Sequence, residues 1–219
     1  MSEPERSDPA ARWGEGVGRA DLMIPPTTPG LRIGLLGGSF NPPHLGHLHV
    51  ARTALARLRL DRLWVLVTPG NPLKSHSDLA SLGRRLAATR RLLDDPRIVV
   101  SACEASFGSP YTWRTVERLA RMAPSVRFVW VMGADNLAGF HRWQQWRRIA
   151  ATVPIAVVDR PNASLATLQA PAAQALADFR LAEIDAATLA TRRVPAWCFL
   201  HGPRVALSST ELRRRGLPA

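Results

Sequence analysis

The chain has 219 residues, of which 46% are hydrophobic, so it is long enough and apolar enough to fold around a packed core. Its 29 basic and 17 acidic residues give a formal net charge of +12, which favours anionic partners such as nucleotide phosphates or nucleic acid. Two distant cysteines exclude a disulfide-rich scaffold, and no apolar run approaches the roughly 18 residues of a membrane helix. Because the first residues also lack a secretory signal pattern, we expect a cytoplasmic protein without a membrane partner.

Residues 1–30 combine Pro, Gly, Ser and charged residues without apolar periodicity, which is typical of a mobile tail. We therefore predict a disordered N-terminal tail over residues 1–30 and one domain over residues 31–219. Met23 lies near the end of the tail and is an alternative start.

Beyond the tail, short apolar runs alternate with segments of helical periodicity. Strands are predicted over residues 31–36, 63–67, 98–100, 126–132, 155–158 and 196–200, the first two of them buried. Helices are predicted over residues 45–58, 82–93, 112–122, 165–179 and 209–215. This alternation predicts an α/β, Rossmann-like fold with a mostly parallel sheet flanked by helices, in which ligands bind beyond the carboxyl ends of the strands.

The loop after the first strand, GGSFNPPHLGH over residues 37–47, is the most informative stretch. Gly37 and Gly38 let the backbone approach a ligand, and the helix that opens next has an amino end that favours an anion. His44 and His47 lie three residues apart on that opening turn, so their imidazoles can share a face and donate hydrogen bonds to phosphate oxygens. An isolated HxxH is more often a cap or a metal site, but the whole constellation is more specific. It is neither a GxGxxG fingerprint nor a P-loop.

This loop resembles the signature of the HxGH nucleotidyltransferases, which move an adenylyl or cytidylyl group onto a phosphate. Further segments occur in the order seen in bacterial nicotinate-nucleotide adenylyltransferases: SPYTWRTVERL (109–119), GADNLAGFHRWQQWRRI (133–149), DRP (159–161) and LSSTELR (207–213). The resemblance covers about residues 31–217. One departure is Asn41, which stands where the family often has an aspartate. Asparagine still suits a turn but brings no charge, which argues against metal binding there.

The resemblance implies transfer of AMP from ATP to nicotinate mononucleotide, giving nicotinate adenine dinucleotide and pyrophosphate in NAD biosynthesis. The second pKa of a phosphate monoester is about 6, so the attacking phosphate is largely a dianion at neutral pH and needs no strong base. Direct in-line attack on the α-phosphorus also needs no protein nucleophile. The protein has to align two anions and stabilise the charge that develops. Mg²⁺ is expected to ride on the triphosphate rather than in a protein cage.

The resemblance also implies the roles of individual residues. His44 and His47 are the catalytic pair, with His47 on the α-phosphate in the transition state and His44 on the ATP phosphates beside it. The ATP-binding residues are Gly37, Gly38, Ser39, Phe40, Lys74, Ser208, Ser209, Thr210 and Arg213. The residues for nicotinate mononucleotide are Thr112 on the carboxylate, Asp135 on a ribose hydroxyl and Trp143 stacked on the pyridine ring.

Each of these roles has a plainer structural alternative. Lys74 can be an exposed loop lysine, the hydroxyls before the last predicted helix can be caps, and Thr112 and Asp135 can likewise be helix N-caps. A tryptophan at helical spacing, such as Trp143, is most often a core residue.

Three functional alternatives remain open at the level of sequence. Two are related adenylyltransferases, which use nicotinamide mononucleotide or phosphopantetheine as the acceptor. The third is a basic nucleic-acid-binding module, suggested by a sequence pI of about 11.5. The arginines are dispersed and no recognised nucleic-acid motif is present, so we expect no specific nucleic-acid partner.

Overall fold

The computed structural model describes residues 13, 15–70, 79–159 and 165–202. Seven strands form one sheet in the order β3-β2-β1-β4-β5-β7-β6, and every neighbouring pair is parallel. The strands are β1 (Arg32–Gly38), β2 (Arg62–Val67), β3 (Ile98–Ser101), β4 (Arg127–Gly133), β5 (Ile155–Val158), β6 (Arg180–Leu181) and β7 (Trp197–Leu200). This confirms the α/β, Rossmann-like prediction, with all six expected strands present and the short β6 added.

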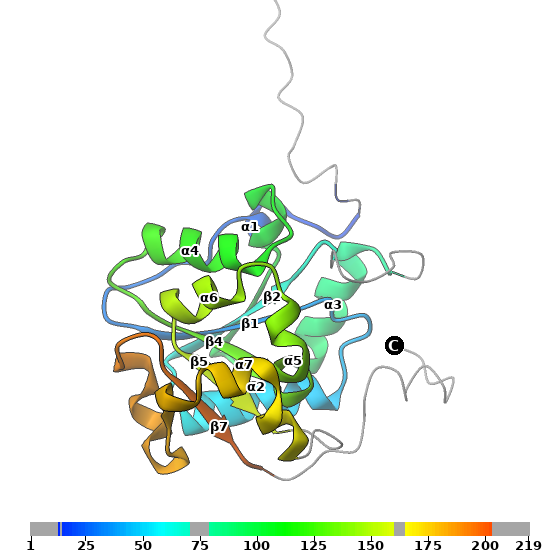
Figure 1. Cartoon of the computed structure of the whole chain (residues 1–219). Helices are drawn as coiled ribbons and strands as arrows, with labels where there is room; N and C mark the ends of the chain where they lie inside the picture. The colour runs from blue at the N-terminus through cyan, green and yellow to red at the C-terminus, as the bar shows by residue number, and fades with distance from the viewer. Residues whose placement is uncertain (1–12, 14, 71–78, 160–164, 203–219) are drawn as a thin grey trace, which may run out of the picture.

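Helices cover both faces of the sheet (Figure 1). One layer contains α2 (Leu45–Arg57), α3 (Leu82–Leu92) and the 3₁₀ segment η6 (Glu183–Thr191). The other contains α4 (Thr112–Met122), α5 (Ala134–Gly139), α6 (Trp146–Thr152) and α7 (Pro171–Ala175). Shorter pieces are α1 (Arg19–Leu22), η2 (Cys103–Phe107), η3 (Phe140–Arg142), η4 (Leu165–Gln169) and η5 (Ala177–Phe179). Among the described helices, none has the length and hydropathy to cross a bilayer.

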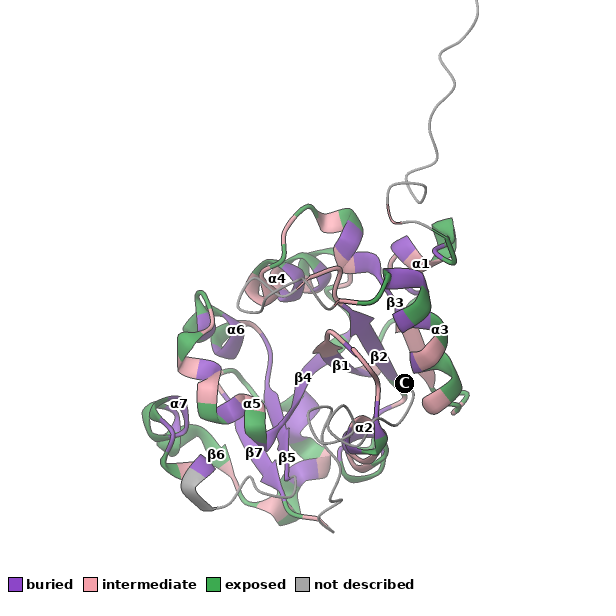
Figure 2. Ribbon diagram, turned by 90° about the vertical axis from the view of Figure 1, so that its right-hand side faces the viewer, coloured by how far each residue is buried: buried purple, intermediate pink, exposed green. Residues whose placement is uncertain are grey.

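The strands inside the sheet, such as β2, β4, β5 and β7, are buried on both faces, which explains their continuous apolar runs. In β4, Phe128, Trp130 and Met132 pack into the layer of α4 to α7, while Val129 and Val131 pack into the layer of α2 and α3. Figure 2 shows this buried sheet between exposed helix surfaces.

The strand order fixes where a ligand can bind. From β1 the chain builds outward to β2 and β3, then returns to place β4 on the other side of β1. The connections on the two sides of this point leave the sheet toward opposite faces, and folds of this class bind ligands beyond the carboxyl ends of the strands at such a point, here β1 and β4.

The prediction of one continuous helix over residues 165–179 is wrong, because the structure has three short helices there: η4, α7 and η5. Pro171 is the first residue of α7, and Ala170 before it is extended, with φ −61° and ψ 146°. The proline ring disfavours a helical conformation in the residue that precedes it. The predicted helix over residues 209–215 lies outside the described residues.

The prediction of a mobile tail does not hold for residues 15–30. Val17 and Leu22 are 9% and 7% exposed and join the core on the α2 and α3 side. The backbone N–H of Gly30 donates to the carbonyl of Ser125 at 2.8 Å. A few apolar residues spaced without periodicity are enough to anchor a segment onto an existing surface, and a periodicity search does not detect them.

Candidate active site

Gly37 and Gly38 are the last two residues of β1, so the prediction that they follow the strand is wrong, and the loop that leads to His44 begins at Ser39. A Cβ atom at Gly37 would lie 2.6 Å from the ring of Trp130, so a side chain there would collide with the neighbouring strand. Phe40 is buried at 1% exposure and has a φ of 47°, which turns the chain sharply. The glycine at position 37 therefore has a packing reason that the sequence analysis did not supply, alongside its proposed role beside ATP.

His44 and His47 lie together at the amino end of α2. His44 is the N-cap residue, and its Nδ1 accepts a hydrogen bond from the backbone N–H of Gly46 at 3.1 Å. The Nδ1 of His47 accepts from the backbone N–H of His44, also at 3.1 Å. The two ring centroids are 3.9 Å apart, and Phe40 packs on His47 with centroids 4.7 Å apart. The predicted pairing of the two imidazoles is therefore present in the structure.

These contacts also determine the tautomer of each neutral imidazole. An Nδ1 atom that accepts from a backbone N–H cannot itself carry a proton, so the ring proton resides on Nε2. Each neutral ring is thereby fixed with an Nε2–H donor. Neither His44 nor His47 has to become a cation in order to donate a hydrogen bond to phosphate.

Arg85 is a central part of this site that the sequence analysis missed. It lies on α3 at 3% exposure and donates to four backbone carbonyls: Ser39 and Thr68 at 2.7 Å, Ala80 at 2.9 Å and Pro69 at 3.2 Å. Burial lowers the pKa of its guanidinium to about 10, so the group remains charged at neutral pH. Arg85 therefore ties the loop after β1 to the loop after β2.

A sequence signal for Arg85 existed. It shares the buried face of α3 with Leu82, Leu86 and Thr89 at helical spacing, where an exposed arginine is not expected. Asn41 adds a second tie, because its Oδ1 accepts from the backbone N–H of Ala80 at 3.1 Å. Asn41 therefore connects its turn to the residue before the N-cap of α3, a long-range contact rather than a bond within the turn.

The expected acceptor side begins at the amino end of α4. Thr112 is the first helical residue, and the N-cap is Tyr111, whose side chain makes no capping hydrogen bond. The alternative of Thr112 as an N-cap is therefore wrong. An 11-residue helix without a side-chain cap presents backbone N–H groups at its amino end, which is a favourable site for a carboxylate.

Trp143 and Asp135 lie after β4, the strand that neighbours β1 in the sheet. Trp143 is half-buried, and its ring makes edge-to-face contacts with Phe140 and Trp130, at centroid distances of 5.3 and 6.2 Å. Asp135 is exposed in the first turn of α5, whose N-cap is Gly133, so the N-cap alternative for Asp135 is also wrong. Trp130 and Trp146, which lie near this ring in the same region of the chain, are both buried.

Glu104 connects η2 to α4, because its Oε1 accepts a hydrogen bond from the Thr115 hydroxyl at 2.9 Å. Burial raises the pKa of the Glu104 carboxyl to about 7, and the Thr115 hydrogen bond opposes that rise. The folded protein thus retains a proton here between about pH 4.5 and pH 7, where the unfolded chain has lost it.

We therefore expect Glu104 to make the protein less stable as pH rises from about 4.5 to about 7, by on the order of 2 kcal/mol. Glu104→Gln keeps the acceptor for Thr115 and removes the titration, so its free energy of unfolding should lose this part of the pH dependence. Urea unfolding of both proteins at about pH 5 and pH 7.5 measures the difference. Parallel pH profiles for the two proteins would contradict the assignment.

Several predicted residues lie outside the described residues. They are Lys74, Ser208, Ser209, Thr210 and Arg213, all assigned to ATP. Within the described ranges, no three His, Cys, Asp or Glu side chains are grouped so as to hold a metal ion.

The fold and the paired histidines at the strand-order reversal define a nucleotidyltransferase, and residues 35–215 match the family model described as cytidylyltransferase-like. The chain is similar to a probable nicotinate-nucleotide adenylyltransferase of Methylorubrum extorquens, at 60% identity over 185 residues, 84% of this chain and 100% of the relative. A relative of the same name from Rhizobium meliloti is 59% identical over 183 residues, 84% of this chain and 97% of the relative. The chain therefore belongs to the nicotinate-nucleotide adenylyltransferases of the cytidylyltransferase-like family.

A solved structure shows the same fold. It is described as Plasmodium falciparum nicotinic acid mononucleotide adenylyltransferase complexed with NaAD, and it has a TM-score of 0.62 at 15% sequence identity. The match covers 84% of this chain and 83% of that chain. The family match and the two relatives confirm the resemblance drawn from the sequence and the enzyme class, and they disfavour the phosphopantetheine enzyme and the nucleic-acid module.

Proposed function

We propose that this enzyme transfers AMP from ATP to nicotinate mononucleotide by direct in-line attack of the acceptor phosphate on the α-phosphorus of ATP. The observation that carries the proposal is the pair of imidazoles at the amino end of α2, each with its Nδ1 occupied by a backbone N–H. Two Nε2–H donors and the positive end of a 13-residue helix favour negative charge at one place. That place adjoins the carboxyl end of β1, where ligands of this fold class bind.

In the proposed mechanism, His47 donates from Nε2 to the α-phosphate as its charge grows, and His44 donates to the adjacent phosphate oxygens. The acceptor phosphate forms the new P–O bond while pyrophosphate leaves with the electrons of the broken bond. Because the acceptor is already a dianion, no residue has to remove a proton from it. The contribution of the protein is alignment and electrostatic stabilisation by donors that need no reorganisation.

The remaining ATP contacts are assigned by the family motifs. Ser39 and Phe40 belong to the loop that Arg85 holds, and Lys74, Ser208, Ser209, Thr210 and Arg213 are proposed to surround the β- and γ-phosphates. Mg²⁺ is proposed to bind the triphosphate oxygens, since Mg²⁺ retains water and phosphate ligands readily. We assign the reaction to the cytoplasm, which suits two free cysteine thiols buried in the core.

On the acceptor side, the amino end of α4 at Thr112 is proposed to bind the nicotinate carboxylate. Trp143 would stack on the pyridine ring and Asp135 would accept from a ribose hydroxyl. Backbone donors suit a carboxylate better than a carboxamide, so the acid should be preferred over nicotinamide mononucleotide.

The direct test is pyrophosphate release with ATP and Mg²⁺, comparing nicotinate mononucleotide, nicotinamide mononucleotide and phosphopantetheine as acceptors. A large preference for nicotinate mononucleotide is expected. A preference for phosphopantetheine would overturn the acceptor assignment but leave the proposed ATP-binding residues in place. No release with any acceptor from folded protein would overturn the proposed reaction.

Trp143 gives a second measurable expectation. Stacking on an aromatic ring contributes about 1–3 kcal/mol, so Trp143→Leu should raise the KM for nicotinate mononucleotide about ten-fold. Trp143→Phe retains a flat ring and should remain close to wild type, while the KM for ATP should be unchanged in both. Equal acceptor KM values for the Leu and Phe variants would show that the ring does not stack on the substrate.

A further inference from the structure

The N-terminal segment, residues 15–30, packs so closely against α3 at Gly83 that no side chain would fit at that position. A Cβ atom built on Gly83 would lie 2.1 Å from the carbonyl oxygen of Glu15 and 3.0 Å from the Cα of Gly16. Gly83 is buried in the first turn of α3, where alanine would otherwise be the better helix former. Glycine at this position is therefore explained by the docked segment and not by the helix itself.

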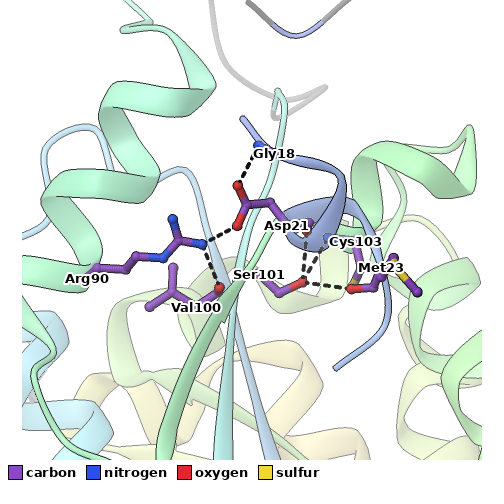
Figure 3. A network of polar contacts seen from close by, with 7 residues as sticks. All are labelled: Gly18, Asp21, Met23, Arg90, Val100, Ser101 and Cys103. Carbon is purple, nitrogen blue, oxygen red and sulfur yellow. Dashed lines mark hydrogen bonds and ion pairs between the residues drawn. The ribbon is translucent and has the colours of Figure 1, made fainter. Parts of the chain in front are cut away.

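Asp21 makes the main polar contacts between this segment and the edge of the sheet at β3 (Figure 3). Its carboxylate forms an ion pair with Arg90 of α3 and accepts from the backbone N–H of Gly18 at 2.8 Å. Its backbone carbonyl accepts from the backbone N–H of Ala102 at 2.8 Å and from the Ser101 hydroxyl at 3.2 Å. Asp21 thus joins α3 to the chain at the end of β3, the edge strand of the sheet.

The chain held by Asp21 leads directly to the acceptor side. The Ser101 hydroxyl also accepts from the backbone N–H of Cys103, the first residue of η2. Glu104 of η2 then accepts from Thr115 in the first turn of α4. These hydrogen bonds, joined by the peptide link between Cys103 and Glu104, connect Asp21 to the amino end of α4, where Thr112 is proposed to meet the nicotinate carboxylate.

We propose that residues 15–30 are a positioning element for the acceptor half of the active site, holding η2 and the amino end of α4 ready for nicotinate mononucleotide. The segment lies wholly before residue 35, where the match to the family model begins. The inference rests on the proposed function for its choice of acceptor. No residue of the segment is proposed to touch the reacting atoms.

The test is made in the full-length chain with Gly83→Ala, whose methyl group would displace Glu15 and Gly16. Hydrogen–deuterium exchange should become faster in residues 15–24 and also in residues 101–107 and the first turn of α4. The KM for nicotinate mononucleotide should rise about five-fold or more, while kcat and the KM for ATP stay within about two-fold. Faster exchange in residues 15–24 with an unchanged KM for nicotinate mononucleotide would overturn the inference. Unchanged exchange in residues 15–24 would also overturn it, because the segment would then not be held by the contact at Gly83.

A milder variant and its control keep the test informative if the Gly83→Ala protein does not fold. Asp21→Asn removes the ion pair with Arg90 and keeps the backbone carbonyl, so it should shift the exchange and the acceptor KM in the same direction by less. The matched control is Asp95→Asn, which removes the exposed Asp95–Arg97 ion pair just before β3 and should change neither. Equal behaviour of Asp21→Asn and Asp95→Asn would overturn the inference. The exchange of residues 101–107 is measured without any substrate, so it separates a failure of this inference from a failure of the proposed reaction.

Discussion

Replacing His47 by Asn should reduce kcat by about 10²–10³-fold, the usual effect of removing one donor that stabilises charge in a transition state. The amide oxygen of asparagine can occupy the position of Nδ1 and accept from the backbone N–H of His44, so the cap at the start of α2 should survive. What the variant lacks is the Nε2–H donor. Stability should therefore stay near wild type while turnover falls, a separation that His47→Ala would not give as clearly.

Steady-state kinetics of three variants decide this prediction. His47→Gln places an amide nitrogen near the position of Nε2 and should recover part of the turnover lost in His47→Asn. The control is His49→Asn on the same helix, where no role in phosphate binding is proposed and kcat should change by a few-fold at most. If His47→Asn retained turnover within a few-fold of wild type, His47 would not be the residue on the α-phosphate.

Replacing Arg85 by Met should lower the free energy of unfolding by about 3 kcal/mol or more, because several buried carbonyls lose a charged donor at once. The KM for ATP should also rise, since the loops after β1 and β2 lose the group that holds them together. Arg85→Lys keeps the charge but lacks the planar fork, so it should be intermediate in both measurements.

Arg84 provides the matched control for this experiment. It is the neighbouring residue on α3 and is exposed, so Arg84→Met should change stability by about 0.5 kcal/mol at most. Urea unfolding and ATP titration of the Arg84 and Arg85 variants make the comparison. An Arg85→Met protein as stable as Arg84→Met would show that the four carbonyl contacts contribute little.

The fold was accessible from the sequence because the strands inside its sheet are buried on both faces. A strand such as β4 appears as an uninterrupted apolar run, and such runs alternating with helical periodicity leave few arrangements other than a parallel sheet. The histidine pair was accessible for a similar local reason. His44 and His47 are three residues apart at a helix start, so one helix turn brings them together without help from distant parts of the chain.

The contribution of Arg85 could not be predicted in the same way. Its four partners come from positions 39, 68, 69 and 80, and only the packing of α3 under two loops brings their carbonyls to one guanidinium. In the sequence it is one arginine among many, next to the exposed Arg84. The reason for Gly37 was hidden as well, because Trp130 reaches it only through the pairing of β1 with β4.

The sequence by itself determined the parallel α/β sheet, the pairing of His44 and His47 at a helix start, and the family to which the chain belongs. These depend on local spacing and on runs of apolar residues, which act over a few positions along the chain. The tertiary structure alone decided that Arg85 is buried, that the proton of each neutral histidine lies on Nε2, and that residues 15–30 belong to the domain. Each of these depends on hydrogen bonds and close contacts that arise only when the chain has folded, some of them between residues far apart in the sequence.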